Sequence, residues 1–199
     1  MTDISSENAQ MTLEEQLKVL EKIGLSLDEG VTIKDMLYSF PEETFQENPF
    51  ELVLFLFGSE IEREPWGRRF SNQVWSFDIE CIHGPGSYVE ILKELARLAG
   101  KESALRDLSD HIDFADGEGW LRYTLDGVTH TIAVEVDDDW ADTFALAEVM
   151  EALEDEGHRF VALENGNQGL IVLYLNEDQM ERLIALLPEK VEYLTDPTP

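Results

Sequence analysis

The chain of 199 residues contains 43 Asp and Glu against 14 Lys and Arg, which gives a formal net charge of −29. This surplus repels nucleic acid and anionic membranes and attracts basic proteins. It does not exclude a folded core, because 43% of the residues are hydrophobic and the aromatic residues (10 Phe, 5 Tyr, 4 Trp) are more numerous than in disordered acidic chains.

The N-terminal part of the chain predicts helices after a flexible tail over residues 1–11. Thr12 and Glu15 form a capping-box pattern, which is followed by an apolar helical stripe and by Gly24 as the end of the helix. Asn48 and Pro49 are typical of the cap and first turn of a helix. The expected helices cover residues 13–23, 33–40 and 50–57, although the last run, apolar on nearly every side, also fits a central strand.

Residues 60–72 form the most basic segment of the chain, and Pro65 and Gly67 indicate a loop. We expect its arginines to bind neighbouring carboxylates. The alternative is a nucleic-acid stacking platform formed with nearby tryptophans, which would suit a basic protein better than an acidic one. The arginines are Arg63, Arg68 and Arg69.

The clearest single unit is a strand followed by a helix. Residues 75–81 alternate apolar and polar, which predicts a half-buried strand. After the turn at residues 83–86, Ser87 and Glu90 form a second capping-box pattern for a helix over residues 88–99.

The second half of the chain predicts two hairpins and two helices. Asp126-Gly127 is a strong two-residue hairpin signal between strands 120–125 and 128–136. A helix over about 140–156, a hairpin of strands 159–164 and 170–175, and a helix over 177–187 follow. These elements predict an α+β fold, with a mainly antiparallel sheet, helices packed on one face and the N-terminal helices preceding it. We expect one domain over residues 12–190, with a weak sub-boundary near 100–110, and a polar tail over 191–199.

The candidate binding site is the segment from Glu135 to Glu156, which contains ten carboxylates and no Lys or Arg. Helical spacing places an apolar stripe on one face, and we expect acidic residues elsewhere to be free for a basic partner. The alternative without a binding role is a solvated helix face, with the aspartates at 137–139 stabilising the N-terminus of the helix through its dipole. The expected partner-binding residues are Asp137, Asp138, Asp139, Glu148, Glu151, Glu154 and Asp155.

The sequence shows no pattern that is specific for catalysis. Asp78 and Glu80 would lie about 7 Å apart on one strand face, a spacing also seen in carboxylate-pair hydrolases, but this is the polar face of the strand. Cys81 falls on the apolar side of that strand and is expected to be an inert thiol rather than a partner of His83. No histidine, cysteine or aspartate spacing fits a metal site, so we expect no catalysis, no metal and no cofactor.

The segment Trp75-Ser-Phe-Asp-Ile-Glu-Cys-Ile82, the helix that begins at Ser87-Tyr-Val-Glu-Ile91, and the later Asp138-Asp-Trp-Ala-Asp142 together resemble small bacterial immunity-type proteins that accompany polymorphic toxins. The resemblance covers about residues 75–190. It implies a protein that inhibits a nuclease-type toxin by occlusion, with carboxylates in place of substrate phosphates. A DNA mimic that blocks a DNA-binding protein fits the same charge.

The single cysteine excludes an internal disulfide and indicates a reducing compartment. The longest apolar stretch, Leu52–Phe57, is too short to cross a bilayer. We therefore expect a cytoplasmic protein that binds a basic protein, and that binds neither nucleic acid nor membranes.

Overall fold

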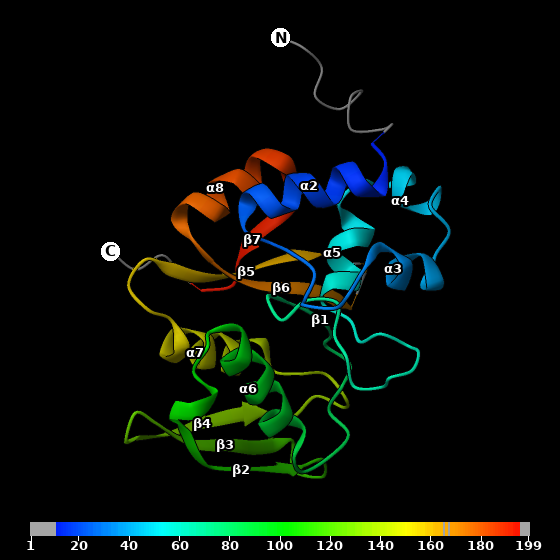
Figure 1. The fold of residues 1–199 in the computed structure, drawn as a ribbon. Coiled ribbons are helices and arrows are strands. Elements are labelled where there is room, and N and C mark those ends of the chain that lie inside the picture. The colour runs from blue at the N-terminus through cyan, green and yellow to red at the C-terminus, as the bar shows by residue number, and fades with distance from the viewer. Residues whose placement is uncertain (1–10, 165, 167, 196–199) are drawn as a thin grey trace.

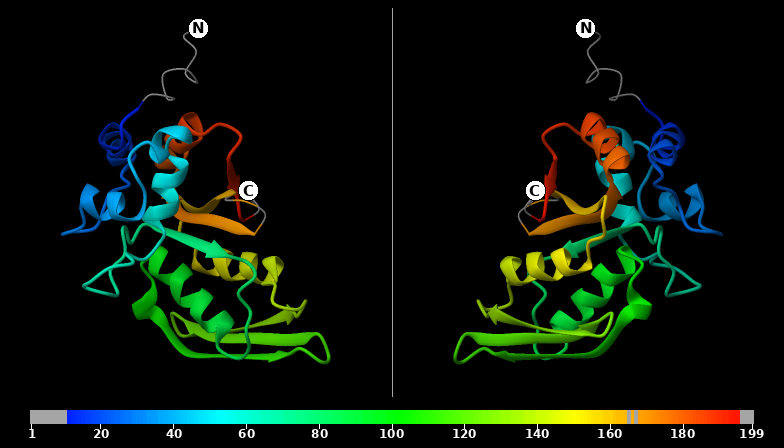
Figure 2. Two further views of the ribbon diagram at one scale, coloured as in Figure 1. Left: turned by 90° about the vertical axis from the view of Figure 1, so that its right-hand side faces the viewer. Right: turned by 90° about the vertical axis from the view of Figure 1, so that its left-hand side faces the viewer.

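The computed structural model describes residues 11–164, 166 and 168–195, and these form four layers (Figures 1 and 2). An outer layer of helices covers a four-stranded sheet, two helices lie beneath that sheet, and a three-stranded sheet closes the other side. The expected N-terminal tail lies outside the described residues except for Met11.

The outer layer contains the N-terminal helices and the last helix. The capping box predicted at Thr12 is confirmed, because the Thr12 hydroxyl accepts a hydrogen bond from the Glu15 amide and the Glu15 carboxylate accepts one from the Thr12 amide. The short helix α4 was not predicted. The helices of this layer are α2 (Leu13–Ile23), α3 (Ile33–Ser39), α4 (Thr44–Glu47), α5 (Glu51–Phe57) and α8 (Glu177–Leu186).

The start of α5 differs from the prediction. Its N-cap is Phe50, with a φ angle of 71°, and not the Asn48-Pro49 pair. The Phe50 amide donates to the side-chain oxygen of Gln16 at 2.8 Å, and the Gln16 amide group donates to the carbonyl of Phe45 at 2.7 Å. The start of α5 is therefore held by the buried side chain of Gln16 from α2, and not by a cap at Asn48 as predicted.

The four-stranded sheet has the order β1-β6-β5-β7, and all its neighbouring strands are antiparallel. The hairpin predicted over residues 159–164 and 170–175 is confirmed as β5 and β6; positions 165 and 167 at its tip lie outside the described residues. Residues 191–193, expected as the start of a polar tail, instead pair with β5. The strands are β1 (Val74–Asp78), β5 (His158–Glu164), β6 (Gly169–Asn176) and β7 (Val191–Tyr193).

The two inner layers come from the middle of the chain. The predicted turn is confirmed, because Asp126 and Gly127 have φ angles of 49° and 81° between paired strands. A strand that was not predicted, β2, begins inside the range 100–110, directly after a 3₁₀ turn at Glu102–Ala104. The elements are α6 (Ser87–Leu98), β2 (Leu105–Asp113), β3 (Glu118–Leu125), β4 (Val128–Glu135) and α7 (Thr143–Leu153).

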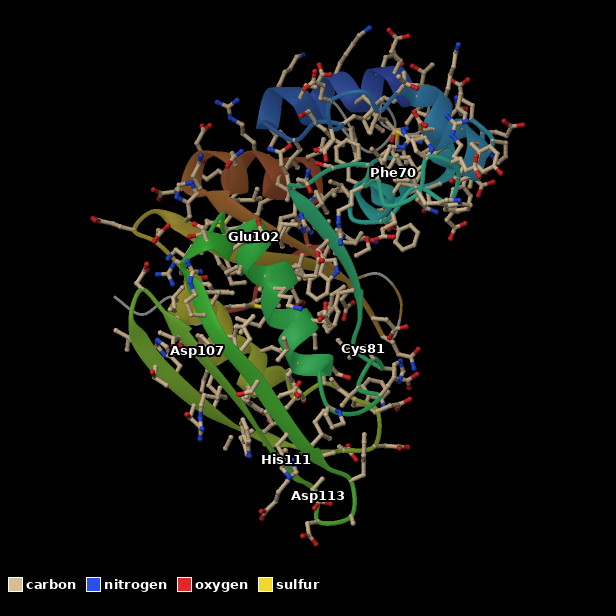
Figure 3. All side chains as sticks on the ribbon, turned by 60° about the horizontal axis from the view of Figure 1, so that its bottom comes forward. Phe70, Cys81, Glu102, Asp107, His111 and Asp113 are labelled. Atoms are coloured by element: carbon tan, nitrogen blue, oxygen red, sulfur yellow. The ribbon has the colours of Figure 1, made fainter. Side chains whose placement is uncertain are left out.

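The four-stranded sheet lies between two hydrophobic cores, and the side chains on its two faces belong to different cores. Val161 and Leu163 pack with α2, α5 and α8, whereas Phe160 and Val172 pack with α6 and α7. The predicted α+β class with antiparallel strands and N-terminal helices is confirmed. Helices cover one face of the three-stranded sheet, whose other face is open and carries His111 (Figure 3), and they cover both faces of the four-stranded sheet.

The N-terminus of α6 is capped from a distant strand. The predicted Ser87–Glu90 box is wrong: Gly86 is the N-cap residue, and the Asp110 carboxylate on β2 accepts hydrogen bonds from the amides of Gly86, Tyr88 and Val89 at 2.6, 3.0 and 3.2 Å. The helix start therefore depends on β2.

We expect Asp110→Ala to lower the free energy of unfolding by about 1–2 kcal/mol, because the first amides of α6 lose their acceptor. Urea denaturation measures the change. Glu90→Gln, at the other position of the predicted box, is the matched control and should leave stability within about 0.5 kcal/mol of the wild type. Equal losses in the two variants would contradict the assignment of Asp110 as the cap.

Candidate acidic binding surface

Helix α7 is shorter than predicted, and this changes the positions of the candidate acidic residues. It begins at Thr143, where the Asp142 carboxylate accepts hydrogen bonds from the amides of Phe144 and Ala145 at 2.9 and 3.2 Å. Asp142 is therefore the N-cap residue of α7, and the aspartates at 137–139 do not cap this helix.

The outer face of α7 combines an aromatic side chain with two carboxylates. Phe144 is 85% exposed, and Glu148 and Glu151, one and two turns further along, are also exposed. The charge of Glu148 adds to the effect of burial in raising the pKa of Tyr123 to about 12. The apolar stripe predicted for the opposite face is confirmed by the buried side chains of Leu146, Val149, Met150 and Leu153.

The last two predicted site residues follow α7 and bind other parts of the chain. The side chain of Glu154 is only 7% exposed. Its carboxylate accepts hydrogen bonds from the Arg159 guanidinium at 2.8 Å, the Phe160 amide at 2.9 Å and the Thr195 hydroxyl at 2.8 Å. Asp155 is exposed but forms an ion pair with Lys101 at 2.7 Å. Glu154 is thus a structural residue rather than part of a free acidic surface.

The three aspartates at 137–139 lie beside the segment that follows β1. The Ile82 amide donates to the carbonyl of Asp139 at 2.9 Å, and the Ala141 amide donates to the carbonyl of Ile79 at 2.7 Å. Asp137 and Asp138 are exposed. The acidic surface therefore extends from the aspartate loop to the end of β1.

The thiol of Cys81 lies within this acidic surface. Burial, together with the charges of Asp78 and Asp139, raises the pKa of Cys81 to about 11. The thiol is half-buried and protonated at neutral pH, as expected for an inert cysteine rather than a thiolate nucleophile.

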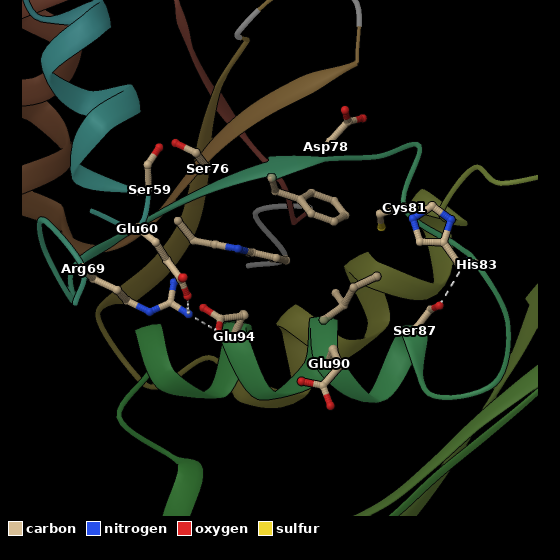
Figure 4. A pocket seen from close by; sticks show the side chains of 14 residues that line it. Ser59, Glu60, Arg69, Ser76, Asp78, Cys81, His83, Ser87, Glu90 and Glu94 are labelled. Atoms are coloured by element: carbon tan, nitrogen blue, oxygen red, sulfur yellow. Dashed lines mark hydrogen bonds and ion pairs between the residues drawn. The ribbon is translucent and has the colours of Figure 1, made fainter. Parts of the chain in front are cut away.

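Sequence reasoning missed a groove between β1 and α6 (Figure 4), which has a volume of about 530 Å³. Its apolar part contains Trp75, Phe77 and Ile91. Trp75 and Phe77 were predicted to lie on the apolar face of a strand, and Trp75 also belonged to the alternative of a stacking platform. Its polar lining comes from three separate segments, so only the tertiary structure brings these side chains together. The polar side chains are Ser59, Glu60, Arg69, Ser76, Asp78, Cys81, His83, Ser87, Glu90 and Glu94.

The carboxylate pair expected on one strand face does not form as predicted. β1 ends at Asp78, and the following residues leave the strand, so that the Glu80 amide donates to the Asp78 carboxylate at 3.0 Å. Asp78 lines the groove, whereas Glu80 pairs through its backbone with Trp140. Within residues 11–164, 166 and 168–195, no three His, Cys, Asp or Glu side chains are placed to share a metal ion.

The arginines of the 60–72 loop bind carboxylates, as predicted. Asp35 accepts hydrogen bonds from Arg63 at 2.5 and 3.1 Å, and Arg68 lies 3.5 Å from the same carboxylate. Arg69 binds Glu94 on α6 at 2.7 Å. The loop is therefore fixed to α3 on one side and to α6 on the other.

Comparison with known proteins gives no match to a family model, to a curated protein or to a solved structure. In the part of the chain that the structure describes, every helix is too short or too polar to cross a membrane.

Proposed function

We propose that this protein is an acidic binding protein that neutralises a basic partner, and that the partner is a nuclease-type toxin which it inhibits by occlusion. The observation that carries the proposal is that Asp137 and Asp138 in the loop before α7, and Phe144, Glu148 and Glu151 on α7, are all exposed, on a chain with a net charge of −29. An exposed aromatic side chain beside carboxylates is the usual composition of an anchor with steering charges around it.

The physical basis is competition with the toxin's substrate. A nuclease holds phosphates with basic side chains, and a rigid array of carboxylates can take the places of those phosphates. Helix α7 provides rigidity because its other face is packed into the core. The long-range field of the whole chain accelerates the encounter, and this field is screened within about 8 Å at 0.15 M salt.

The direct test is coexpression with toxin-like proteins encoded beside its gene. We expect one of them to be basic, to arrest growth alone and to be neutralised in a stable complex with this protein. Complexes formed instead with a DNA-binding protein, in competition with duplex DNA and without toxin inhibition, would support a DNA mimic and refute the immunity role.

Reversing four charges tests the surface itself. In the variant Asp137→Lys, Asp138→Lys, Glu148→Lys, Glu151→Lys, we expect association with the basic partner to slow by about tenfold or more at low salt, because steering is reduced. Stopped-flow mixing at several salt concentrations measures the rate. The four side chains are exposed, so the melting temperature should change little.

The matched control reverses four exposed carboxylates of α2 and α8, which lie on the other side of the four-stranded sheet: Glu14, Glu21, Glu177 and Glu181. It makes the same change in net charge and should slow association less. Equal rates and equal salt dependence for the two variants would show that only the total charge matters, and that the α7 surface is a solvated face.

A further inference from the structure

We infer that the groove between β1 and α6 receives an arginine side chain of the basic partner. This inference rests on the proposed function, and it adds a specific ligand group, a guanidinium, at a place that is distinct from the outer face of α7. Three features of the groove carry it: its aromatic part, its charge, and the guanidinium of the chain itself that already lies at one end.

The apolar part of the groove suits a flat cation. The rings of Trp75 and Phe77 lie 4.4 Å apart with an interplanar angle of 31°, and Ile91 of α6 also lines the groove. Phe77 and Ile91 are buried, so the half-buried Trp75 offers most of the aromatic surface. Guanidinium groups stack on aromatic faces and lose little hydration on doing so, whereas an ammonium group is compact and strongly hydrated. The groove therefore favours arginine over lysine.

The charge of the groove suits the same ligand. Four carboxylates line it, from Glu60, Asp78, Glu90 and Glu94, and Arg69 is the one Lys or Arg among its lining residues. Glu60 and Glu94 already pair with Arg69, and the exposed Glu90 pairs with Lys93 at 2.7 Å. A cationic side chain would therefore gain its attraction from Asp78, which forms no ion pair among the described residues, and from sharing Glu90 with Lys93.

Arg69 shows how the groove holds a guanidinium. Its terminal nitrogen lies 2.7 Å from Glu94 and 3.7 Å from Glu60, at the end of the groove near Ser59 and Ser76 (Figure 4). At the other end, Cys81, His83 and Ser87 line the groove, and Glu90 forms part of its rim on α6, with its side chain directed away from β1 (Figure 4). The volume of about 530 Å³ lies within the range of small-ligand sites. This second end is the place for the partner's arginine.

The test uses N-acetylarginine amide as a probe at 0.15 M salt, with the neutral, nearly isosteric N-acetylcitrulline amide and with N-acetyllysine amide as comparisons. Chemical shifts of the Trp75 indole and of the Phe77 and Ser87 amides are followed by NMR. We expect saturable shifts with the arginine probe, weaker binding of the lysine probe, and none with citrulline. Glu90→Gln should weaken arginine binding by about 2- to 5-fold, since this carboxylate is at the rim. Glu181→Gln, an equally conservative change at an exposed position of α8, should leave it unchanged.

Two results would overturn the inference: shifts spread over the whole acidic surface, or arginine binding that Glu90→Gln leaves unchanged. The experiments distinguish a failure of the arginine-groove inference from a failure of the proposed function. If the α7 charge reversal slows partner association but Glu90→Lys has no effect on partner affinity, the acidic surface is the interface and the groove is not part of it. If no basic partner is bound at all while the arginine probe binds in the groove, the proposed function fails and the ligand site stands.

Discussion

Replacing Glu154 with alanine should lower the free energy of unfolding by about 2–4 kcal/mol, although this residue belongs to the most acidic segment of the chain. Its carboxylate binds Arg159, the Phe160 amide and the Thr195 hydroxyl, and it is almost fully buried. Removing it leaves an arginine without its partner and two donors without acceptors, which is far more costly than losing a surface charge.

Glu151→Ala is the matched control, because Glu151 lies three residues earlier in the same segment and is exposed. It should change stability by less than about 0.5 kcal/mol. Chemical denaturation of both variants gives the comparison. If the two variants unfold at the same denaturant concentration, Glu154 does not have the structural role that its contacts indicate.

Asp35→Asn should lower the free energy of unfolding by about 2–4 kcal/mol at neutral pH. The Asp35 side chain is only 4% exposed and binds Arg63, Arg68 and Thr32, so it joins α3 to the 60–72 loop. The cost is smaller than for a fully buried pair because Arg63 is one-third exposed and can turn to water. Glu29→Gln, an exposed carboxylate shortly before α3, is the control and should have little effect.

The same residue makes stability depend on pH in the acidic range. Burial alone would raise the pKa of Asp35, but the hydrogen bonds from Arg63 and Thr32 outweigh it and lower the pKa from 3.8 to about 2. Because the folded state binds this proton more weakly than the unfolded state, the stabilisation is present above about pH 4 and is lost as the pH falls toward 2. The difference in stability between wild type and Asp35→Asn should therefore narrow over that interval. A constant difference from pH 6 to pH 2 would contradict this assignment.

The parts of the fold that were predicted correctly depend on contacts between residues close in sequence. The Thr12 capping box and the Asp126-Gly127 turn each involve residues within four positions of one another. Such patterns fix local geometry whatever the rest of the chain does.

The strand β2 could not be predicted from periodicity because it is irregular. Its pairing with β3 shifts between Arg106 and Ser109, and Asp107 has a φ angle of 55°. This bulge breaks the alternation that marks a strand, so Leu105, Leu108 and Ile112 do not follow a period of two. Polar residues fill the rest of the strand, and one of them, Asp110, is needed to cap α6.

The candidate site was predicted in part. The position of the acidic outer face of α7 follows from helical spacing, so Glu148 and Glu151 are exposed as predicted. The role of Glu154 depends on Arg159 and Thr195, and the latter lies 41 residues away in the sequence. The groove forms where β1, α6 and the 60–72 loop come together in the folded chain, and no local sequence pattern indicates this arrangement.

The shared sheet has a consequence for synthesis on the ribosome. Helices α6 and α7 and the three-stranded sheet come from one continuous stretch, residues 87–153, and can associate as soon as it has emerged. Helices α2 to α5 emerge earlier, yet they pack on strands and a helix from residues 158–186, which emerge last. The part of α5 that packs on β5, β6 and α8 therefore stays uncovered until these elements emerge, and closing so long a loop is slow. A nascent chain stalled before β5 would expose this surface, together with the faces of α6 and α7 that pack on Phe160 and Val172, and would become a substrate for chaperones and proteases.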